Sequence, residues 1–252
     1  MQTHEEEKAL AKLFYKLDKQ VKKAMVDYRL IEDGDKILLG LSGGKDSLAL
    51  VELLGRRMKI FKPKFTVVAV HISMTNMGYV VDLDYLSKHC AQYDIPFYHI
   101  EKSFDLTTDK RKSPCFLCSW TRRKAMFDLA KQLGCNKMAL GHHQDDILQT
   151  LLMNMTFQGA FGTMPPLLKM DKFEMTIVRP LCLIAEKELV QLQLMQQYIS
   201  QKQPCQYECS SSRPEMKQVV ALLETMNERA RYNLWASMTN IQNDYLPKPI
   251  KA

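Results

Sequence analysis

Six residues, Ser42-Gly43-Gly44-Lys45-Asp46-Ser47, join two segments of opposite character. Residues 36–41 before them are apolar and strand-like, and an amphipathic helical run begins near residue 47. A strand that turns through two glycines into a helix N-terminus directs backbone N–H groups and the helix dipole toward one point. The segment therefore predicts a strand–loop–helix unit that binds an anion, and phosphate is the favoured occupant.

The spacing excludes two other phosphate-binding loops. A Walker A loop needs a serine or threonine after its lysine and a glycine five positions before Gly44, whereas this chain has Asp46 and Leu39 there. The dinucleotide fingerprint fails because the glycines are adjacent. A plain turn would explain the glycine pair but not the lysine, the aspartate and the two serines. The motif S-G-G-x-D-S resembles the pyrophosphate loop of the PP-loop ATPases, which cleave ATP to AMP and pyrophosphate in order to adenylate a substrate.

Strand-like and helical runs alternate along the middle of the chain. Strands are expected at residues 36–41, 66–72, 97–100, 137–141 and 175–178, and helices at 47–58, 82–93, 119–133, 145–157 and 186–198. This order predicts an α/β fold with a doubly wound, mostly parallel sheet and helices on both faces. Ligands bind beyond the carboxyl ends of such strands, which is where residues 42–47 lie.

Helical segments flank this alternating region. Residues 5–28 carry apolar side chains on one helical face, and lysines occupy the opposite face: Lys8, Lys12, Lys16, Lys19 and Lys23. The lysines form either a solvated surface or a stripe that follows the phosphates of a polyanion. A final helical stretch is expected at about residues 214–240. We expect an N-terminal helical segment (1–30), a PP-loop ATPase domain (31–199) and a C-terminal helical segment that contains cysteines (200–252).

A second polar motif, Gly141-His142-His143-Gln144-Asp145-Asp146, has the same layout as the first, because it also joins an expected strand to an expected helix. A parallel sheet brings both loops to one edge. Capping of the helix would need only one aspartate. Near a triphosphate, Asp145 and Asp146 can hold Mg²⁺ across the phosphate oxygens. Asp46 is a candidate for the same role, and Lys45 would bind phosphate oxygens as a point charge.

The composition favours an ordinary globular protein of the cytoplasm. The chain has 252 residues, of which 46% are hydrophobic and 25% charged. No apolar run approaches the ~20 residues of a membrane span, and the polar, acidic N-terminus does not resemble a signal peptide. A net charge of +7 favours a polyanionic partner.

Seven cysteines in a reducing compartment indicate metal ligands, redox thiols or buried small side chains rather than structural disulfides. Cys115 and Cys118 form a C-x-x-C, expected in a loop that leads into a helix, and Cys205 and Cys209 form a later C-x-x-x-C. The first pair fits a zinc half-site, a redox dithiol or an Fe–S ligand pair, and the four together fit a structural zinc site. The remaining cysteines are expected to be buried packing residues: Cys90, Cys135 and Cys182.

Basic residues surround the C-x-x-C and can attract RNA phosphates. They are Lys110, Arg111 and Lys112 before it and Arg122, Arg123 and Lys124 after it. Trp120 could stack on an unpaired base or pack in the core.

The four motifs S-G-G-K-D-S, C-x-x-C, G-H-H-x-D-D and a late cysteine, in this order, resemble the TtcA/TtuA group of PP-loop tRNA thiolases, with the TtcA type the most similar. The likeness spans nearly the whole chain and includes the Met164-Pro-Pro166 turn and Arg179-Pro-Leu181 followed by Glu186-Lys187. It implies an ATP-dependent tRNA sulfurtransferase: ATP adenylates O2 of a tRNA cytidine, position 32 in the TtcA type, pyrophosphate leaves, and sulfur replaces the activated oxygen to give 2-thiocytidine.

The resemblance also implies the residues of the site. Those implied to bind ATP are Ser42, Gly43, Gly44, Lys45, Asp46, Ser47, Gly141 and His142, and those implied to be catalytic are Lys45, Asp46, Asp145 and Asp146. An oxygen-sensitive [4Fe–4S] cluster would be held by Cys115, Cys118 and Cys209, with Cys205 as the alternative third ligand. The implied partners are tRNA, a sulfur donor such as a cysteine desulfurase, and a second copy of the chain in a homodimer.

The chain departs from the TtcA pattern at two places. Ser73-Met-Thr-Asn-Met-Gly78 stands where the family has Asp-Gln-Lys-Gln-Pro-Gly, and Cys209-Ser-Ser-Ser212 replaces Cys-Gly-Ser-Gln. These changes leave ATP use intact and keep the base and its tRNA position open. One alternative is a PP-loop ATPase that activates RNA or a small molecule for amination, with a structural zinc. The other is a non-catalytic, zinc-stabilised RNA-binding module, for which Lys45 and the aspartates would be superfluous.

Overall fold

A computed structural model describes residues 3–60, 62–78, 80–105, 113–171, 174–201 and 212–247. The chain separates into two compact units. The first comprises Met1–Gln144 and Pro165–Ser210, and the second comprises Asp145–Met164 and Ser211–Ala252. The domain boundaries expected near residues 30 and 199 stay a prediction.

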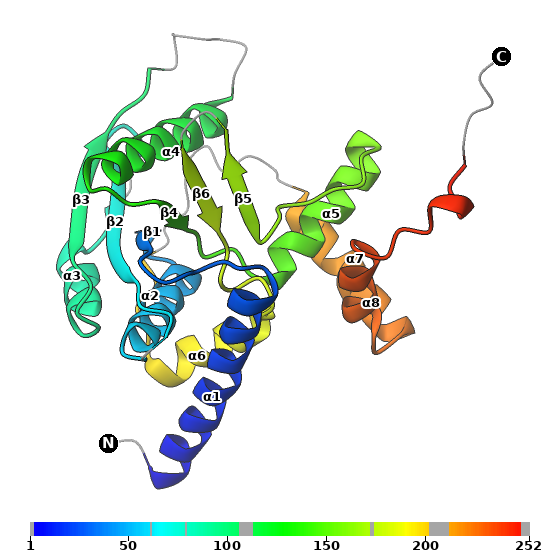
Figure 1. Ribbon diagram of the computed structural model, residues 1–252, viewed down its shortest axis with the longest axis horizontal. Coiled ribbons are helices and arrows are strands. Elements are labelled where there is room, and N and C mark those ends of the chain that lie inside the picture. Colours follow the sequence, from blue (N-terminus) through cyan, green and yellow to red (C-terminus); the bar gives the residue numbers. More distant parts are fainter. Residues whose placement is uncertain are drawn as a thin grey trace. The chain divides into compact units, whose positions relative to one another are not determined.

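The first unit is built on a sheet whose strands have the order β3-β2-β1-β4-β6-β5 (Figure 1). The strands are β1 (Lys36–Gly40), β2 (Thr66–Met74), β3 (Phe97–Lys102), β4 (Lys137–Ala139), β5 (Leu167–Met170) and β6 (Met175–Val178). All neighbouring strands are parallel except β5 and β6. The expected mostly parallel sheet is confirmed. The antiparallel edge strand β5 was not expected.

Both faces of the sheet are covered by helices, as predicted. The helices of this unit are α1 (His4–Asp27), α2 (Lys45–Met58), α3 (Leu83–Ala91), α4 (Pro114–Gln132) and α6 (Glu186–Gln196). Side chains alternate along a strand, so Leu38 and Val68 face α4, where they join a core cluster with Met126 and Phe127. Their neighbours Ile37 and Val67 point to the opposite face and are also buried.

Helix α1 begins with a capping box: the Thr3 hydroxyl accepts from the Glu6 amide (3.3 Å) and the Glu6 carboxylate accepts from the Thr3 amide (2.8 Å). Leu13, Leu17 and Val21 are buried along one side of the helix, which packs on α6 and α2. The expected amphipathic helix is therefore confirmed. The lysines predicted for the opposite side are exposed.

Helix α4 starts five residues earlier than expected. Ser113 caps it by accepting from the Phe116 amide (3.3 Å), and Pro114, whose missing N–H costs nothing at a helix start, occupies the first turn. The prediction that Cys115 and Cys118 lie in a loop before the helix is therefore wrong, because both lie in its first turns.

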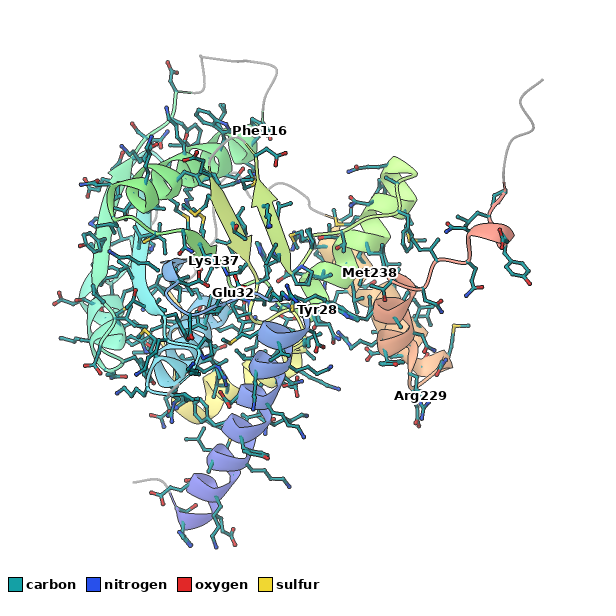
Figure 2. The ribbon with its side chains drawn as sticks, viewed as in Figure 1. Tyr28, Glu32, Phe116, Lys137, Arg229 and Met238 are labelled. Atoms are coloured by element: carbon teal, nitrogen blue, oxygen red, sulfur yellow. The ribbon has the colours of Figure 1, made fainter. Side chains whose placement is uncertain are left out.

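The strand order places the functional loops. The chain leaves β1 toward β2 and β3 on one side and resumes at β4 on the other side of β1. The loops after β1 and β4 therefore open at the same carboxyl edge, at the point where the strand order reverses. At the opposite ends of these strands, Lys137 contacts Asp35 (2.7 Å) and Glu32 (3.5 Å) (Figure 2).

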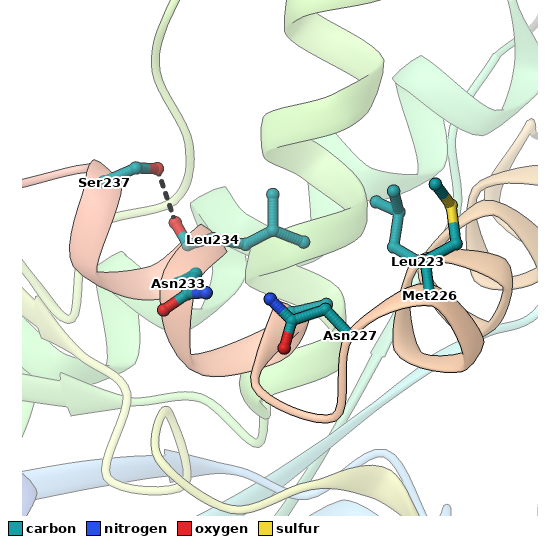
Figure 3. Close-up of a pocket in the computed structure, with 7 residues that line it drawn as sticks. Leu223, Met226, Asn227, Asn233, Leu234 and Ser237 are labelled. Carbon is teal, nitrogen blue, oxygen red and sulfur yellow. Dashed lines mark hydrogen bonds between the residues drawn. The ribbon is translucent and has the colours of Figure 1, made fainter.

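The second unit is helical in its described residues. It contains α5 (Gln144–Gln158), which begins at the last residue before the boundary, α7 (Arg213–Met226), α8 (Ala230–Ser237) and the short 3-10 helix η1 (Asn243–Tyr245). The helical stretch expected at about residues 214–240 is confirmed, and the extended backbone at Asn227 divides it into α7 and α8. Between α7 and α8 lies a mainly apolar groove of about 360 Å³, lined by Leu223, Met226 and Leu234 among others (Figure 3). Within the described ranges, no helix is long and apolar enough to span a membrane.

Candidate functional site

The loop after β1 is shaped by its own serines and by one glycine with a positive φ. Ser47 Oγ donates to the Gly44 carbonyl (2.9 Å) and accepts from the Gly43 amide (3.2 Å), and it lies 3.1 Å from Ser42 Oγ. Gly43 has φ = +86°, which strongly favours glycine. Gly44 is the N-cap of α2 and offers no side chain to satisfy the amides of the first turn. The loop therefore presents an uncapped helix N-terminus, as the predicted anion site requires.

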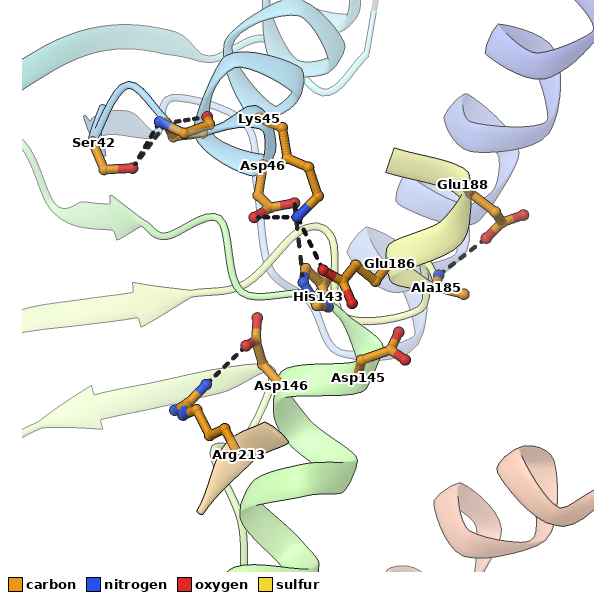
Figure 4. A network of polar contacts seen from close by, with 12 residues as sticks. Ser42, Lys45, Asp46, His143, Asp145, Asp146, Ala185, Glu186, Glu188 and Arg213 are labelled. Atoms are coloured by element: carbon orange, nitrogen blue, oxygen red, sulfur yellow. Dashed lines mark hydrogen bonds and ion pairs between the residues drawn. The ribbon is translucent and has the colours of Figure 1, made fainter. Parts of the chain in front are cut away.

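Lys45 stands between two carboxylates at the start of α2 (Figure 4). Its Nζ lies 3.1 Å from Asp46 Oδ1 and 3.2 Å from Glu186 Oε1 at the start of α6. Burial opposes the charged form, but Asp46 and Glu186 outweigh it and raise the pKa of Lys45 above its ordinary value. Lys45 therefore carries its positive charge throughout the physiological pH range.

Asp46 keeps unused acceptor capacity. Oδ2 accepts a hydrogen bond from Lys45 (3.3 Å), whereas the buried Oδ1 has no hydrogen-bonded partner among the described residues. Oδ1 is the nearer oxygen to Lys45 but lacks hydrogen-bond geometry, and His143 Nε2 lies 4.0 Å from it. An oxygen in this position fits a further cation.

Gly141 brings the loop after β4 against the first loop. A Cβ at Gly141 would stand 3.2 Å from the Asp46 carbonyl carbon and from the Ser47 amide nitrogen. The contact is with backbone, which cannot move aside as the end of a side chain can. The expectation that the two loops share one edge of the sheet is confirmed for Gly141 and His143.

Arg179 orients His142. The buried guanidinium donates through Nε to His142 Nδ1 (3.2 Å) and through NH1 to the Pro165 carbonyl. Because a guanidinium can only donate, Nδ1 of His142 must be the acceptor, and the remaining imidazole proton lies on Nε2. Arg179 thus connects His142 to the turn that contains the two prolines.

Gln201 holds the end of the first unit's described chain against the phosphate loop. The backbone N–H of Gln201 donates to the Gly43 carbonyl (2.8 Å). Its side-chain Oε1 accepts from the backbone N–H of Asp82 (3.1 Å). Cys205 and Cys209 follow within eight residues in the sequence. Both cysteines lie outside the described residues, so the choice between them stays a prediction.

Asp145 and Asp146 are ion-paired within the second unit. Asp146 Oδ1 lies 2.9 Å from Arg213 NH1 of α7 (Figure 4), and Asp145 Oδ1 lies 2.8 Å from Arg231 NH1 of α8. Arg231 also makes a two-pronged contact with Glu224 (3.1 Å for each hydrogen bond). Burial opposes the charge of Arg231, but Glu224 and Asp145 raise its pKa.

Cys115 and Cys118 lie three positions apart in the first turns of α4 and are both partly buried. Residues at this spacing share one helix face, and a helix N-terminus favours negative charge. Cys118 also packs against the core cluster below α4. Trp120 is 53% exposed, so the alternative that it packs in the core is wrong, and Lys124 Nζ lies 5.6 Å from its ring.

The other described cysteines are buried packing residues, as predicted. Cys90, Cys135 and Cys182 are at most 6% exposed. Burial raises the pKa of Cys90 to about 12 and also raises that of Cys135. These thiols do not form thiolates readily. In the ranges that the structure covers, no three His, Cys, Asp or Glu side chains converge on a metal position.

Sequence reasoning missed the partners that complete these contacts. Glu186 and Arg179 were noted only as parts of stretches shared with the thiolases, and no role was assigned to either. Gln201 and Arg213 carried no local signal, because each meets its partner across more than 60 residues of sequence, and the same holds for the contact of Arg231 with Asp145. Only the position of Glu186 in the first turn of an expected helix could have suggested that it faces the sheet edge.

Comparison with known proteins agrees with the fold and the motifs. The model of the PP-loop domain matches residues 13–207. The tRNA-cytidine(32) 2-sulfurtransferase of Paraburkholderia xenovorans is 37% identical over 241 residues, which cover 93% of this chain and 71% of that protein. The enzyme of the same name from Paracidovorax citrulli is 38% identical over 228 residues, with 88% and 72% covered.

A solved structure agrees as well. The U34-tRNA thiolase NcsA from Methanococcus maripaludis, determined with its [4Fe-4S] cluster, superposes with a TM-score of 0.74 at 27% identity and covers 90% of this chain and 78% of its own. A match of this extent at 37% identity shows that the chain belongs to the tRNA-cytidine(32) 2-sulfurtransferase family of PP-loop proteins.

Proposed function

We propose that this protein is an ATP-dependent tRNA sulfurtransferase that converts a cytidine, at position 32, to 2-thiocytidine. The observation that carries the proposal is the joint presence of two parts in a chain of this family. One part is the loop of residues 42–47 with Lys45 and Asp46, and the other is the paired Cys115 and Cys118. Amination with a structural zinc, the alternative reaction, is not favoured by relatives named as sulfurtransferases.

The phosphate loop would bind ATP and promote loss of pyrophosphate. The amides at the start of α2 would receive the phosphate oxygens, and the Lys45 charge would offset the negative charge that develops on the leaving pyrophosphate. Asp46 and Glu186 keep Lys45 protonated for this role. Adenylation is needed because the O2 oxygen of a pyrimidine leaves poorly, whereas AMP leaves readily.

Carboxylates beside the loop would hold Mg²⁺. The buried Oδ1 of Asp46, which accepts no hydrogen bond from the described residues, is suited to a hard cation. Asp145 and Asp146 remain candidates because of their carboxylates and their place in the chain, two and three residues after His143. A metal on either of them would compete with the arginine that contacts its Oδ1.

Cys115, Cys118 and Cys209, or Cys205 in its place, would hold a [4Fe–4S] cluster. The donor set fits, because thiolates are the usual ligands of Fe–S clusters and the first two thiols lie on one face of a helix N-terminus. When bound through three cysteines, the cluster would carry the sulfur that replaces the activated oxygen. Cys118 would fix one side of it against the packed core.

Two remaining parts of the proposal, a sulfur donor such as a cysteine desulfurase and a homodimeric state, rest on the resemblance to the thiolases. A cytoplasmic location rests on the composition of the sequence. The substrate tRNA is supported by the names of the relatives.

The test is to purify the protein anaerobically and supply Mg²⁺-ATP, sulfide and unmodified tRNA. We expect a brown protein that forms AMP and 2-thiocytidine. Asp46→Asn should abolish AMP formation while tRNA binding and the brown colour persist, because only the phosphate site is changed. Cys115→Ser should lose the iron but still bind ATP. A colourless protein with stoichiometric zinc would reject the cluster, and unchanged AMP formation in Asp46→Asn would reject the role of Asp46.

A further inference from the structure

Helix α1 carries a row of lysines that the catalytic site does not use. The helix is 24 residues long, about 36 Å at 1.5 Å per residue. Lys8, Lys12 and Lys19 make no ion pair in the described part of the chain, whereas Lys16 pairs with Glu188 (2.7 Å) and Lys23 with Asp27 (2.6 Å). The unpaired lysines are spaced by four and seven residues, so they share the face opposite buried Leu13 and Leu17.

This face is unsuited to a membrane. An amphipathic helix binds lipid through its apolar side, but in α1 that side is already covered by α2 and α6. The side left exposed is mainly charged, although Tyr15 and Val26 are also exposed on α1. A partner on this face would be bound mainly by positive charge, which is how proteins bind nucleic-acid phosphates.

The row ends at a basic pocket. A cavity of about 310 Å³ lies where α1 ends and is lined in part by Glu32. Four cations, Lys22, Arg29, Arg57 and Lys62, and the carboxylate of Glu32 line it, and Asp33, outside the lining, lies 3.8 Å from Lys62. The Glu32 carboxylate also pairs with Lys137 (3.5 Å), so it neutralises little of the positive charge of the pocket.

The buried Arg57 indicates that a ligand of this pocket would be an anion. Its side chain is only 5% exposed, and NH1 contacts Asp18 (2.5 Å). Its buried Nε has no acceptor among the residues that the structure describes. A buried guanidinium that uses only part of its donor set costs stability unless another acceptor completes it. An anion in the adjoining cavity would lower that cost.

We propose that the unpaired lysines of α1 and the pocket at its end form one surface that binds the phosphate backbone of the substrate tRNA through Lys8, Lys12, Lys19, Lys22, Arg29 and Arg57. The inference rests on the proposed function for the identity of the RNA. The pocket adjoins the end of α2 that is remote from the phosphate loop, about 18 Å away for the twelve residues from Lys45 to Arg57. The surface therefore serves an extended RNA and not ATP.

The test compares two variants of equal charge. Lys8→Gln/Lys12→Gln/Lys19→Gln removes the row, and Lys88→Gln/Lys131→Gln/Lys169→Gln removes three exposed lysines elsewhere. Binding of unmodified tRNA is measured by anisotropy over a range of KCl concentrations. Each lost phosphate contact should reduce the slope of log Kd against log salt by about 0.7–0.9. We expect the row variant to lose about two units of slope, the control to lose less than half of one, and ATP cleavage to stay unchanged in both.

The pocket is tested separately with Lys22→Gln/Arg29→Asn. Arg29 has φ = +49°, a conformation that asparagine tolerates, so the protein should still fold. We expect weaker binding of tRNA and unchanged thermal stability. An unchanged slope in both row and pocket variants overturns the proposal, as does a slope loss that the control reproduces.

Two further outcomes separate the surface from the proposed reaction. If the wild-type protein binds tRNA through this surface but forms no 2-thiocytidine, the surface stands and the reaction fails. If 2-thiocytidine forms and no variant changes the slope, the reaction stands and the surface fails. Tighter binding to vesicles containing phosphatidylserine than to tRNA, lost in the row variant, would assign the surface to a membrane and reject the proposal.

Discussion

Two glycines allow the shape of the phosphate loop because they have no Cβ. Gly43 adopts φ = +86°, and a Cβ there would meet Gln201 Cβ at 2.8 Å. Gly141 does not have a positive φ. Glycine is required there because the backbone of Asp46 lies too close to leave room for a Cβ. The sequence showed the glycine pair and its place between strand and helix. It could not show that Gln201, more than 150 residues later, presses on Gly43.

Gly43→Ala should therefore destabilise the protein. The strained conformation alone costs about 1–3 kcal/mol, and the contact with Gln201 adds to it. Gly44→Ala is the matched control, since Gly44 has φ = −77° and its nearest neighbour would be 3.6 Å away. Chemical denaturation of both variants measures the difference. Equal free energies of unfolding for the two would show that the loop does not have the described conformation.

Pairs of helices are joined by buried charged groups that no local pattern predicts. Glu188, in the first turn of α6, accepts from the Ala185 amide (3.0 Å) and from Gln20 of α1 (3.2 Å), and it pairs with Lys16 (2.7 Å). The amphipathic patterns predicted both helices but not which polar groups would meet between them. The early start of α4 could have been predicted, because a serine followed by proline is a common helix start.

Glu188 should make stability depend on pH. Burial opposes its charge, but Lys16, the Ala185 amide and Gln20 outweigh burial and lower the pKa of Glu188. Its contribution is therefore present above its ordinary pKa and is lost as the pH falls through the lowered value. Glu188→Gln should cost about 1–2 kcal/mol at pH 7. The difference from wild type should shrink below pH ~4. A difference that stays constant down to pH ~3 would contradict this role.

The helices of the second unit should depend on Arg231. This side chain joins α8 to Glu224 on α7 and to Asp145 on α5, and it is largely buried. Arg231→Met removes the positive charge that both carboxylates contact, which should cost roughly 2–3 kcal/mol, less than a fully buried pair because Glu224 is partly exposed. Hydrogen exchange in α8 should accelerate strongly. Arg213→Met, at a more exposed pair, should have a much smaller effect. Similar exchange in the two variants would show that Arg231 does not hold the helices together.

At the scale of the whole molecule, the alternation of strands and helices was enough to predict the parallel sheet and the edge where its loops meet. The antiparallel strand β5 was not predictable in this way, because residues 167–170 are a short edge segment without clear alternation. The motif order also indicated a thiolase, and the relatives bear out the family. What sequence could not supply is the set of arginine, glutamate and glutamine partners around each motif, since these contacts exist only after folding.

The proposed activity of this chain is the formation of 2-thiocytidine in tRNA. Mass spectrometry of tRNA nucleosides from a strain that lacks the gene tests it most directly, with the gene returned as wild type, Asp46→Asn or Cys115→Ser. We predict that 2-thiocytidine is absent from the deletion strain, is restored by the wild-type gene and is not restored by either variant. A full complement of 2-thiocytidine in the deletion strain, or its restoration by Cys115→Ser, would contradict the claim.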